Sequence, residues 1–370
     1  MRSKSRTIFL VLGRLGKSLT TYKILPVLET RIFDRILVFR ERKGEPIEGV
    51  KYITLEFLSA IKPIWFRKVI QNVIEPIQLI FYSIALRPDV INGYQLVPKG
   101  INSLIASKIS FRKCIISTIG GIPEIETYFK NRHFWTALNI MVLKYSDIVT
   151  TKGKNVTDYL INKGIDEGKI FTFNGSINLS RFKNKVTLAR DIDILFVGNF
   201  SSLKGPDRVI KIILTLKQEI PDIKAVFLGT GVLFPEVEEA INDFKLKNNV
   251  KLEGHVEETE DYFNRAKILI MPSKSEGLSS AMLESMACGC VPIVSDVGCM
   301  NEAAINGENS ILIENYDDIG SFSENALFLL KNHEVRESLA RNGIEFVNEK
   351  YSDQEQARIF KEIWACLTQK

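Results

Sequence analysis

The stretch ILIMPSKSEGLSSAMLESMA, residues 268–287, decides how this chain folds. Its first four residues form an apolar run of the kind found in a strand that is buried on both faces. A loop of small residues follows, and alanine, methionine and leucine then recur as they do in a helix that faces a core. A buried strand, a short loop and a helix form the repeating unit of a parallel sheet, so the stretch predicts a doubly wound α/β fold.

Two glutamates in this stretch, Glu276 and Glu284, are eight residues apart and predict a binding site. The layout places Glu276 at the carboxyl edge of the sheet and Glu284 about one turn into the helix. Helix N-termini bind phosphate well, and carboxylates accept hydrogen bonds from sugar hydroxyls. One loop could therefore hold the diphosphate, the sugar and the ribose of a nucleotide sugar. The alternative is a pair of surface carboxylates that the helix dipole favours.

The stretch resembles the Glu-x7-Glu signature of the family 4 retaining glycosyltransferases, which are group 1 enzymes with the GT-B fold. The resemblance is ordered over roughly residues 145–315 and weak over residues 1–140. It implies two doubly wound, Rossmann-like domains that face each other across a cleft. The other segments that carry it are ILFVGNF (194–200), KGPD (204–207), FLGTG (227–231), VKLEGHV (250–256), GCVPIV (289–294) and the spaced residues Gly298, Glu302 and Gly307.

The resemblance implies two catalytic residues. Glu276 would accept hydrogen bonds from the donor sugar and orient it, and Lys204 would contact the diphosphate. A lysine at a helix N-terminus is electrostatically unfavourable, unless an anion is bound there. Positive charge at this point would stabilise the leaving group as the anomeric bond breaks. The alternative for Lys204 is an ordinary solvent-exposed lysine.

The resemblance also implies the rest of the donor site. Glu284 would bind the ribose hydroxyls, and backbone N–H groups after Gly277 would cradle the diphosphate. The full donor-binding set is Gly13, Arg14, Gly198, Asn199, Lys204, Gly277, Leu278, Ser279 and Glu284, with His255 and Val256 near the base. His255 could equally be a surface histidine in a loop.

Two positions depart from the family pattern. Many members have Arg where this chain has Asn199, and Arg14 or Lys17, in the loop GRLGKS (13–18), could replace that charge. The same loop does not fit a Walker P-loop, which requires Gly where this chain has Val11. Many members also have a histidine in the loop that is TIGG (118–121) here, so we assign no catalytic histidine.

The order of apolar runs predicts two domains in the 370 residues. The expected strands are 7–12, 35–39, 51–55, 90–92, 113–117, 147–150 and 170–173, followed by 192–197, 225–228, 250–252, 267–271, 292–294 and 310–313. We expect residues 1–182 to form a basic, acceptor-binding domain and residues 183–350 to bind the nucleotide sugar, with the polar stretch 183–190 as the linker between them. Residues 351–370 would form a helix that crosses back to the first domain.

Charge is divided unevenly between these halves. Residues 1–182 hold 28 Lys and Arg against 14 Asp and Glu, whereas residues 183–370 hold 21 against 30. A basic half indicates an anionic partner, and no nucleic-acid motif accompanies the charge. We therefore expect an anionic membrane surface or a lipid phosphate rather than nucleic acid; the alternative is an ordinary solvated surface.

No membrane-spanning helix is expected, because polar residues interrupt the most apolar segment, 69–86. The three histidines are far apart and the five cysteines lack zinc-site spacing, so we expect no metal site. The cysteines are expected to be structural thiols in a cytoplasmic protein. A peripheral position at the inner face of the membrane is a further expectation from the basic first half.

These observations favour a retaining, metal-independent glycosyltransferase that needs no cofactor beyond its UDP- or GDP-linked sugar. The acceptor would be a glycan or a lipid-linked molecule, in the synthesis of a bacterial surface polysaccharide. Two alternatives stay open. One is another GT-B enzyme, an epimerase or a phosphorylase, and the other is a non-catalytic protein that binds nucleotide sugars.

Overall fold

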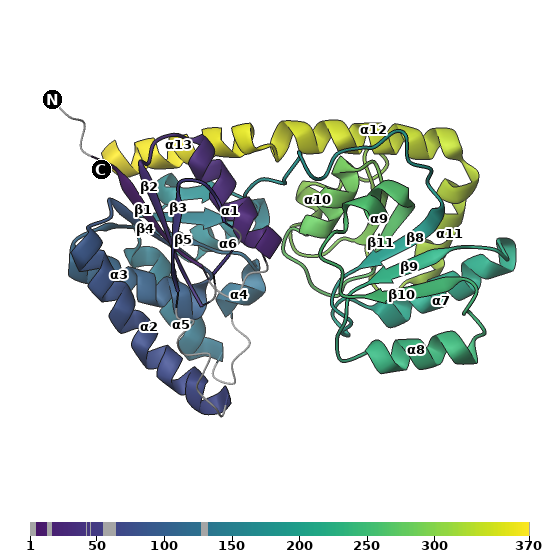
Figure 1. Ribbon diagram of the computed structural model, residues 1–370, viewed down its shortest axis with the longest axis horizontal. Helices are drawn as coiled ribbons and strands as arrows, with labels where there is room; N and C mark the ends of the chain where they lie inside the picture. Colours follow the sequence, from purple (N-terminus) through teal and green to yellow (C-terminus); the bar gives the residue numbers. More distant parts are fainter. Residues whose placement is uncertain are drawn as a thin grey trace. The chain divides into compact units, whose positions relative to one another are not determined.

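The computed structural model describes residues 5–12, 17–41, 43–44, 46–54, 64–126 and 132–369. The chain divides into two compact units, of which the first comprises residues 1–176 and 353–370 and the second comprises residues 177–352 (Figure 1). Each unit contains one parallel sheet flanked by helices. The predicted doubly wound α/β fold is confirmed for both.

The first unit is built on a seven-stranded parallel sheet with the strand order β3-β2-β1-β4-β5-β6-β7. Strand β1 (Thr7–Val11), which pairs with β2 and β4, is buried along its whole length, as is typical of parallel sheets covered on both faces. The other strands are β2 (Arg35–Arg40), β3 (Val50–Thr54), β4 (Val90–Tyr94), β5 (Lys113–Ser117), β6 (Ile148–Thr151) and β7 (Ile170–Thr172).

Helices cover both faces of this sheet. Alternate residues of β1 point to opposite faces, so Ile8 and Leu10 pack in one core with α1 (Lys17–Glu29) and α13 (Asp353–Gln369). Phe9 and Val11 pack in a second core with α2 (Ile64–Leu86) and α3 (Ile101–Ser110). The remaining helices are α4 (Ile122–Glu126), α5 (Arg132–Tyr145), α6 (Lys154–Asn162) and two short turns, Leu96–Gly100 and Glu167–Lys169.

The second unit has a six-stranded parallel sheet with the order β10-β9-β8-β11-β12-β13. Its strands are β8 (Ile192–Val197), β9 (Ala225–Leu228), β10 (Val250–Gly254), β11 (Ala266–Met271), β12 (Val291–Ser295) and β13 (Ile311–Ile313). Its helices are α7 (Pro206–Glu219), α8 (Phe234–Asp243), α9 (Glu260–Arg265), α10 (Ser280–Ala287), α11 (Ile319–Lys331), α12 (His333–Lys350) and the turn Met300–Glu302.

The direction of winding in this sheet reverses between β8 and β11, which are neighbours although 68 residues and two strands separate them in sequence. Loops that follow the strands on either side of such a switch point diverge and leave a crevice at the carboxyl edge of the sheet. The loops after β8 and β11 are the ones that carry Lys204 and Glu276. The strand order therefore predicts a ligand site at the same edge of the sheet where the sequence motifs predict one.

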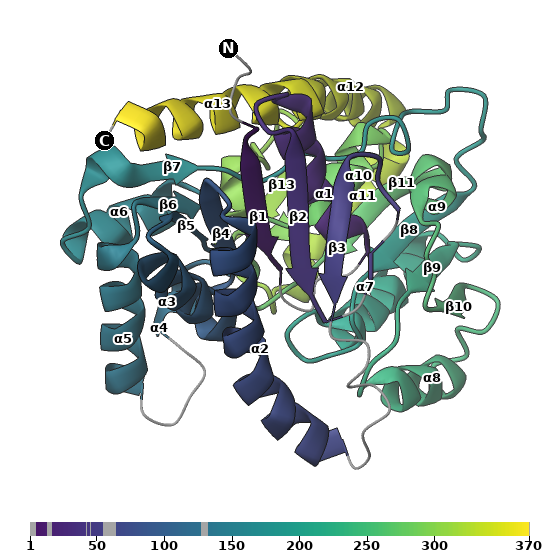
Figure 2. The same cartoon turned by 60° about the vertical axis from the view of Figure 1, so that its left-hand side comes forward.

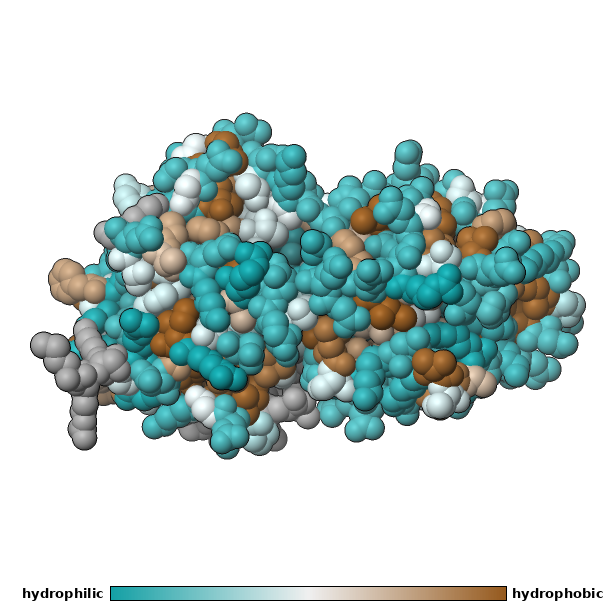
Figure 3. Space-filling view, turned by 90° about the horizontal axis from the view of Figure 1, so that it is seen from above, coloured by the Kyte–Doolittle hydropathy of each residue, from teal (hydrophilic) through white to brown (hydrophobic). Residues whose placement is uncertain are grey.

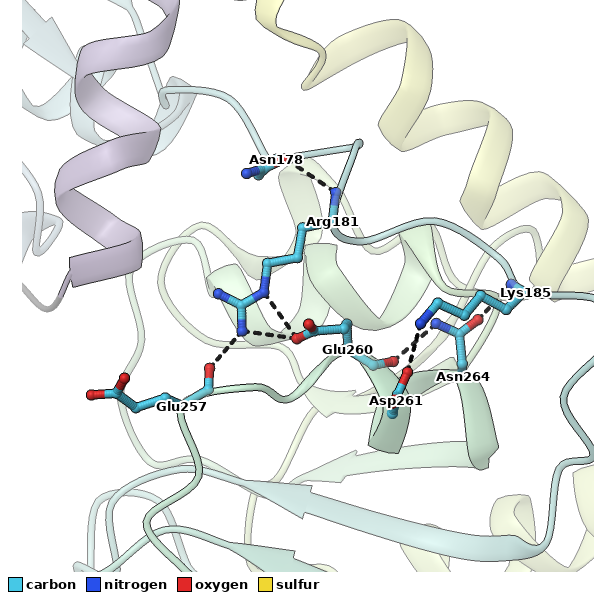
Figure 4. A network of polar contacts seen from close by, with 7 residues as sticks. All are labelled: Asn178, Arg181, Lys185, Glu257, Glu260, Asp261 and Asn264. Carbon is cyan, nitrogen blue, oxygen red and sulfur yellow. Dashed lines mark hydrogen bonds and ion pairs between the residues drawn. The ribbon is translucent and has the colours of Figure 1, made fainter. Parts of the chain in front are cut away.

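The boundary between the units differs from the expected one, since residues 177–182 belong to the second unit rather than the first. The ring of Phe182 packs edge-to-face on Phe263, with 6.1 Å between the ring centroids. Arg181 donates from Nε to the Glu260 carboxylate over 2.9 Å and also contacts the Glu257 carbonyl (Figure 4). These contacts tie the segment to α9 and the residues before it.

The expected linker, residues 183–190, is also part of the second unit. The backbone N–H of Lys185 donates to Asn264, and its ammonium group pairs with Asp261 over 2.6 Å (Figure 4). Arg190 donates to carbonyl groups of Ala266 and Cys288. Polar composition alone predicted a linker, whereas specific hydrogen bonds hold this segment against α9 and β11.

The expected strands are all present, with ends within about two residues of those expected. The apolar segment 69–86 lies within helix α2. Among the described residues, no helix combines the length and the hydropathy that a membrane-spanning segment requires.

Candidate functional site

The loop between β11 and α10 presents Glu276 at the carboxyl edge of the second sheet. The side chain of Glu276 is only 8% exposed. Its Oε1 accepts a hydrogen bond from the Ser273 hydroxyl over 2.8 Å and pairs with the ammonium group of Lys204. A buried carboxylate requires such partners, because burial without them would cost several kcal/mol.

Lys204 comes from the loop between β8 and α7. Gly205 follows it in the left-handed region, with φ of 68°, and Pro206 begins α7. A proline is suited to the first position of a helix, because its missing N–H would have no helical partner there. The structure thus brings together Lys204 and Glu276, the two predicted catalytic residues, from positions 72 residues apart.

A pocket of about 310 Å³ lies at the carboxyl ends of β8, β9 and β10. Four of its lining residues were predicted from the sequence, namely Gly198, Asn199, His255 and Val256; the others are Val197, Leu228, Gly229, Thr230 and Thr259. The predicted base-proximal residues and two predicted donor-binding residues therefore share one pocket.

Lys204 lies next to this pocket as well as to Glu276. A Cβ atom built on Gly198 would be 3.7 Å from Cγ of Lys204, so the lysine stem passes directly over that glycine. The pocket, the ammonium group of Lys204 and the carboxylate of Glu276 consequently follow one another along the edge of the sheet. A base, a diphosphate and a sugar are connected in the same order in a nucleotide sugar.

Glycines permit the close approach of backbones around this site. A Cβ on Gly229 would be 1.9 Å from the Gly198 carbonyl oxygen, and a Cβ on Gly298 would be 2.0 Å from that of Glu276. Both glycines also have positive φ, a conformation that other residues rarely adopt. A side chain at either position would displace a loop that forms the site.

The N-terminus of α10 is capped by Ser279, whose hydroxyl accepts from the Met282 N–H over 3.4 Å. Gly277 accepts a hydrogen bond from the Cys299 N–H through its carbonyl oxygen. Leu278 is half-buried between these two residues. This loop is thus held by α10 on one side and by the loop after β12 on the other.

Glu284 is not in the lining of the pocket. It lies about one turn into α10, as expected, and its side chain is mostly buried. Gly13 and Arg14 fall outside the described residues, and Lys17 is described only as the first residue of α1. The role of Glu284 in binding the ribose remains a prediction. So does the role of Arg14 or Lys17 in supplying the positive charge that many family members have at the position of Asn199.

Sequence reasoning missed Arg208, a buried residue in the first turn of α7. Its guanidinium group donates to the Ser202 carbonyl over 2.9 Å and to the Pro272 carbonyl over 3.0 Å. It also lies 5.0 Å from the ring centroid of Tyr316. Arg208 therefore connects the loop of Lys204 to the loop of Glu276. The available signal was a second cation at a helix N-terminus, where the dipole disfavours one.

The first unit holds a further polar group that the sequence did not reveal. Glu124 accepts hydrogen bonds from the N–H groups of Leu96, Ile119 and Gly120 over 2.6–2.8 Å. Burial raises the pKa of Glu124, although these three donors act in the opposite direction. The loop 118–121, in which many family members have a histidine, is thus anchored by a carboxylate. No group of three metal-ligating side chains occurs among the residues that the structure describes.

The sequence of the second unit matches a known family. Residues 180–346 fit the family model described as glycosyl transferases group 1. This match covers nearly the whole of the second unit. An uncharacterized glycosyltransferase of Methanocaldococcus jannaschii is 29% identical over 270 residues, 70% of each chain. The capsular polysaccharide biosynthesis glycosyltransferase CapM of Staphylococcus aureus is 24% identical over 285 residues, 72% of this chain and 74% of CapM.

Solved structures extend the likeness to both units. HepE of Anabaena, in complex with UDP, has a TM-score of 0.75 at 15% identity and covers 97% of this chain and 99% of its own. A glycosyltransferase from Rickettsia africae has a TM-score of 0.77 at 17% identity and covers 99% of both chains. These likenesses show that both units together have the GT-B fold.

Proposed function

We propose that this protein is a retaining glycosyltransferase that transfers a sugar from a nucleotide-diphospho donor to a glycan or lipid-linked acceptor. The observation that carries the proposal is the row formed by the pocket at Gly198, the ammonium group of Lys204 and the buried carboxylate of Glu276. It supports placing the base in the pocket, the diphosphate beside Lys204 and the sugar beside Glu276.

The chemistry follows from the charges. When the bond between the sugar and the diphosphate breaks, negative charge grows on the leaving oxygen, and Lys204 stabilises it. Glu276 accepts hydrogen bonds from sugar hydroxyls and holds Lys204 in place. The acceptor hydroxyl attacks from the face that the diphosphate leaves and gives its proton to the leaving phosphate oxygen. The sugar keeps its anomeric configuration, and no metal ion is required to balance the charge.

Relatives support the donor and acceptor classes. The HepE structure contains UDP, and a structural neighbour, a point mutant of S. aureus TarM, was crystallised with UDP and α-GlcNAc-glycerol. CapM is named for capsular polysaccharide biosynthesis. We therefore favour UDP over GDP as the donor nucleotide and a surface polysaccharide or its lipid-linked precursor as the product. The basic first half supports an acceptor that lies on an anionic, cytoplasmic membrane surface.

The proposal is tested by NMR of the reaction with α-linked UDP-sugars. Wild-type protein should release UDP and form a product, or a hydrolysed sugar, whose anomeric signal first appears in the α configuration. Glu276→Gln should slow this reaction at least a hundredfold, because a neutral amide orients both the sugar and Lys204 poorly. A β product would exclude retention, and free interconversion of nucleotide sugars without an acceptor would favour an epimerase.

A further inference from the structure

Helix α2 of the first unit is apolar on the face that points away from its own core. Leu79 and Ser83 are fully buried on its inner side. On the opposite side, the side chains of Val69, Val73, Ile77, Phe81 and Ile84 are 52–63% exposed. Their spacing of three or four residues places them in one stripe along the helix. A surface helix normally has polar residues there, so the stripe is typical of a helix that is covered on both sides.

The two neighbouring helices extend this apolar surface. Figures 1 and 2 show α2, α3 and α5 in one layer on the same side of the sheet. The well-exposed large hydrophobic side chains among those described in the first unit all lie on these helices or directly after α3; besides the stripe they are Ile105, Ile109, Phe111, Phe134, Met141 and Tyr145. By contrast, the face seen from above in Figure 3 is mostly hydrophilic, with small and separate hydrophobic areas.

The exposed charged side chains of the same layer are positive. Glu75 is the only acidic residue in the sequences of α2, α3 and α5, and it is buried in an ion pair with Lys99. Lys108 on α3, Lys144 on α5 and Arg87, just after α2, are exposed. The outer face of this layer therefore combines apolar side chains with cations and presents no acidic group on its helices.

We infer that the outer faces of α2, α3 and α5, which we call the outer layer, dock on an anionic lipid bilayer. Apolar side chains of an interfacial helix enter the boundary between headgroups and acyl chains, and nearby cations contact the anionic headgroups. A second copy of the chain would instead bring like charges together across the interface. The inference deepens the proposed membrane position of the acceptor, but it rests on the first unit alone and not on the donor site.

Vesicle flotation of the full chain tests this inference. We expect the protein to bind vesicles that contain 30% phosphatidylglycerol and to bind pure phosphatidylcholine at least tenfold more weakly. The triple variant Val73→Ser, Ile77→Ser, Phe81→Ser should lose at least tenfold in binding to the anionic vesicles. Lys108→Glu with Lys144→Glu should lose binding most clearly at low salt, because salt screens exposed charges.

The matched control is Phe328→Ser, which removes a half-exposed phenylalanine on α11 of the second unit. It should bind vesicles like the wild type. Outward-facing positions were chosen so that the variants fold, and circular dichroism together with UDP binding by the triple variant would verify this. Equal binding of wild type and triple variant, or no binding of wild type to anionic vesicles, would overturn the inference. A dimer in light scattering that the triple variant dissociates would assign the outer layer to self-association instead.

Flotation measures membrane binding and not sugar transfer. Its result is therefore independent of whether the second unit binds a nucleotide sugar. Vesicle binding by a protein that binds no nucleotide would support the outer layer and contradict the proposed function. The reverse result would leave the proposed function standing and remove the membrane inference.

Discussion

At the scale of single residues, the site depends on one cation and one carboxylate that hold each other in place. Lys204 is partly exposed, whereas Glu276 is nearly buried. The carboxylate therefore fixes the ammonium group at the edge of the pocket, where it can meet a diphosphate. Binding of the donor would give Lys204 a second anionic partner and free the Glu276 oxygens for sugar hydroxyls.

Replacing Lys204 should affect catalysis more than folding. We predict that Lys204→Met lowers kcat by a factor of about 10²–10³, the range observed when one stabilising donor is removed from a developing anion. Lys204→Arg should retain part of the activity because it keeps the charge. The measurement is the steady-state rate of UDP release.

Lys211 provides the matched control for this variant. It is an exposed lysine on α7, the helix that Lys204 precedes. Lys211→Met removes the same charge from the same unit and should leave the rate unchanged. Similar losses from both variants would show that overall charge, rather than the position of Lys204, supports the reaction.

At the scale of elements, Arg208 links the loop of Lys204 to the loop of Glu276. Gly298 allows the loop after β12 to approach the loop of Glu276 closely. We predict that Arg208→Met lowers the free energy of unfolding by about 2–4 kcal/mol, because the Ser202 and Pro272 carbonyl groups lose their donor. It should also raise the KM for the donor, since the loops of Lys204 and Glu276 would no longer be linked. Urea denaturation and donor kinetics measure the two effects.

Arg208→Lys separates the roles of charge and geometry. A lysine keeps the charge but lacks the planar fork that reaches two carbonyl groups at once. We expect it to recover less than half of the lost stability. Full recovery would mean that Arg208 acts through its charge alone and does not link the loops.

Gly298 should not tolerate a side chain. A Cβ here would be 2.0 Å from the Glu276 carbonyl oxygen, and φ is 63°. Gly307 has a similar φ of 75° but no atom within 4 Å of its Cβ position. We predict that Gly298→Ala loses about 1–3 kcal/mol more in unfolding free energy than Gly307→Ala, because only Gly298 adds a clash to the backbone strain. Equal losses would show that the loop can move away from Gly298.

The sequence predicted the elements well because each expected strand is an apolar, β-branched run bounded by turns. It also singled out Lys204 and Glu276 through the family resemblance, and the structure brings these two side chains together. It missed Arg208 and Glu124, because their partners are backbone groups in loops, and two of these, the Pro272 carbonyl and the Leu96 N–H, are distant in sequence. It also placed the unit boundary six residues late, because a polar stretch resembles a linker until its hydrogen bonds to α9 are known.

At the scale of the whole molecule, the two units have different surfaces and different sites. The second unit contains the pocket at Gly198 and matches the group 1 glycosyltransferase family model. The first unit carries the apolar, cationic outer layer and the anchored loop 118–121. Under the proposed function and the membrane inference, the second unit would activate the sugar and the first would attach the protein to the acceptor surface.

Thiol reactivity provides a test of the folded state as a whole. Cys114, Cys288, Cys290 and Cys299 are buried, and only Cys366 is partly exposed. Burial raises the pKa of Cys114 and of Cys290 to about 12, so their reactive thiolate forms are scarce near neutral pH. We predict one fast-reacting thiol with Ellman's reagent at pH 8, lost in Cys366→Ser, and five in urea. Two or more fast thiols in the native protein would contradict the described packing.

Under the proposed function, the row from the Gly198 pocket through Lys204 to Glu276 binds a nucleotide diphosphate. The most direct measurement is calorimetric titration of wild type, Lys204→Met and Lys211→Met with UDP, with GDP as a comparison. We predict mid-micromolar binding of UDP by wild type and Lys211→Met, which corresponds to roughly 6 kcal/mol, and at least tenfold weaker binding by Lys204→Met. No binding of either nucleotide to folded wild type, or equal binding by all three proteins, would contradict it.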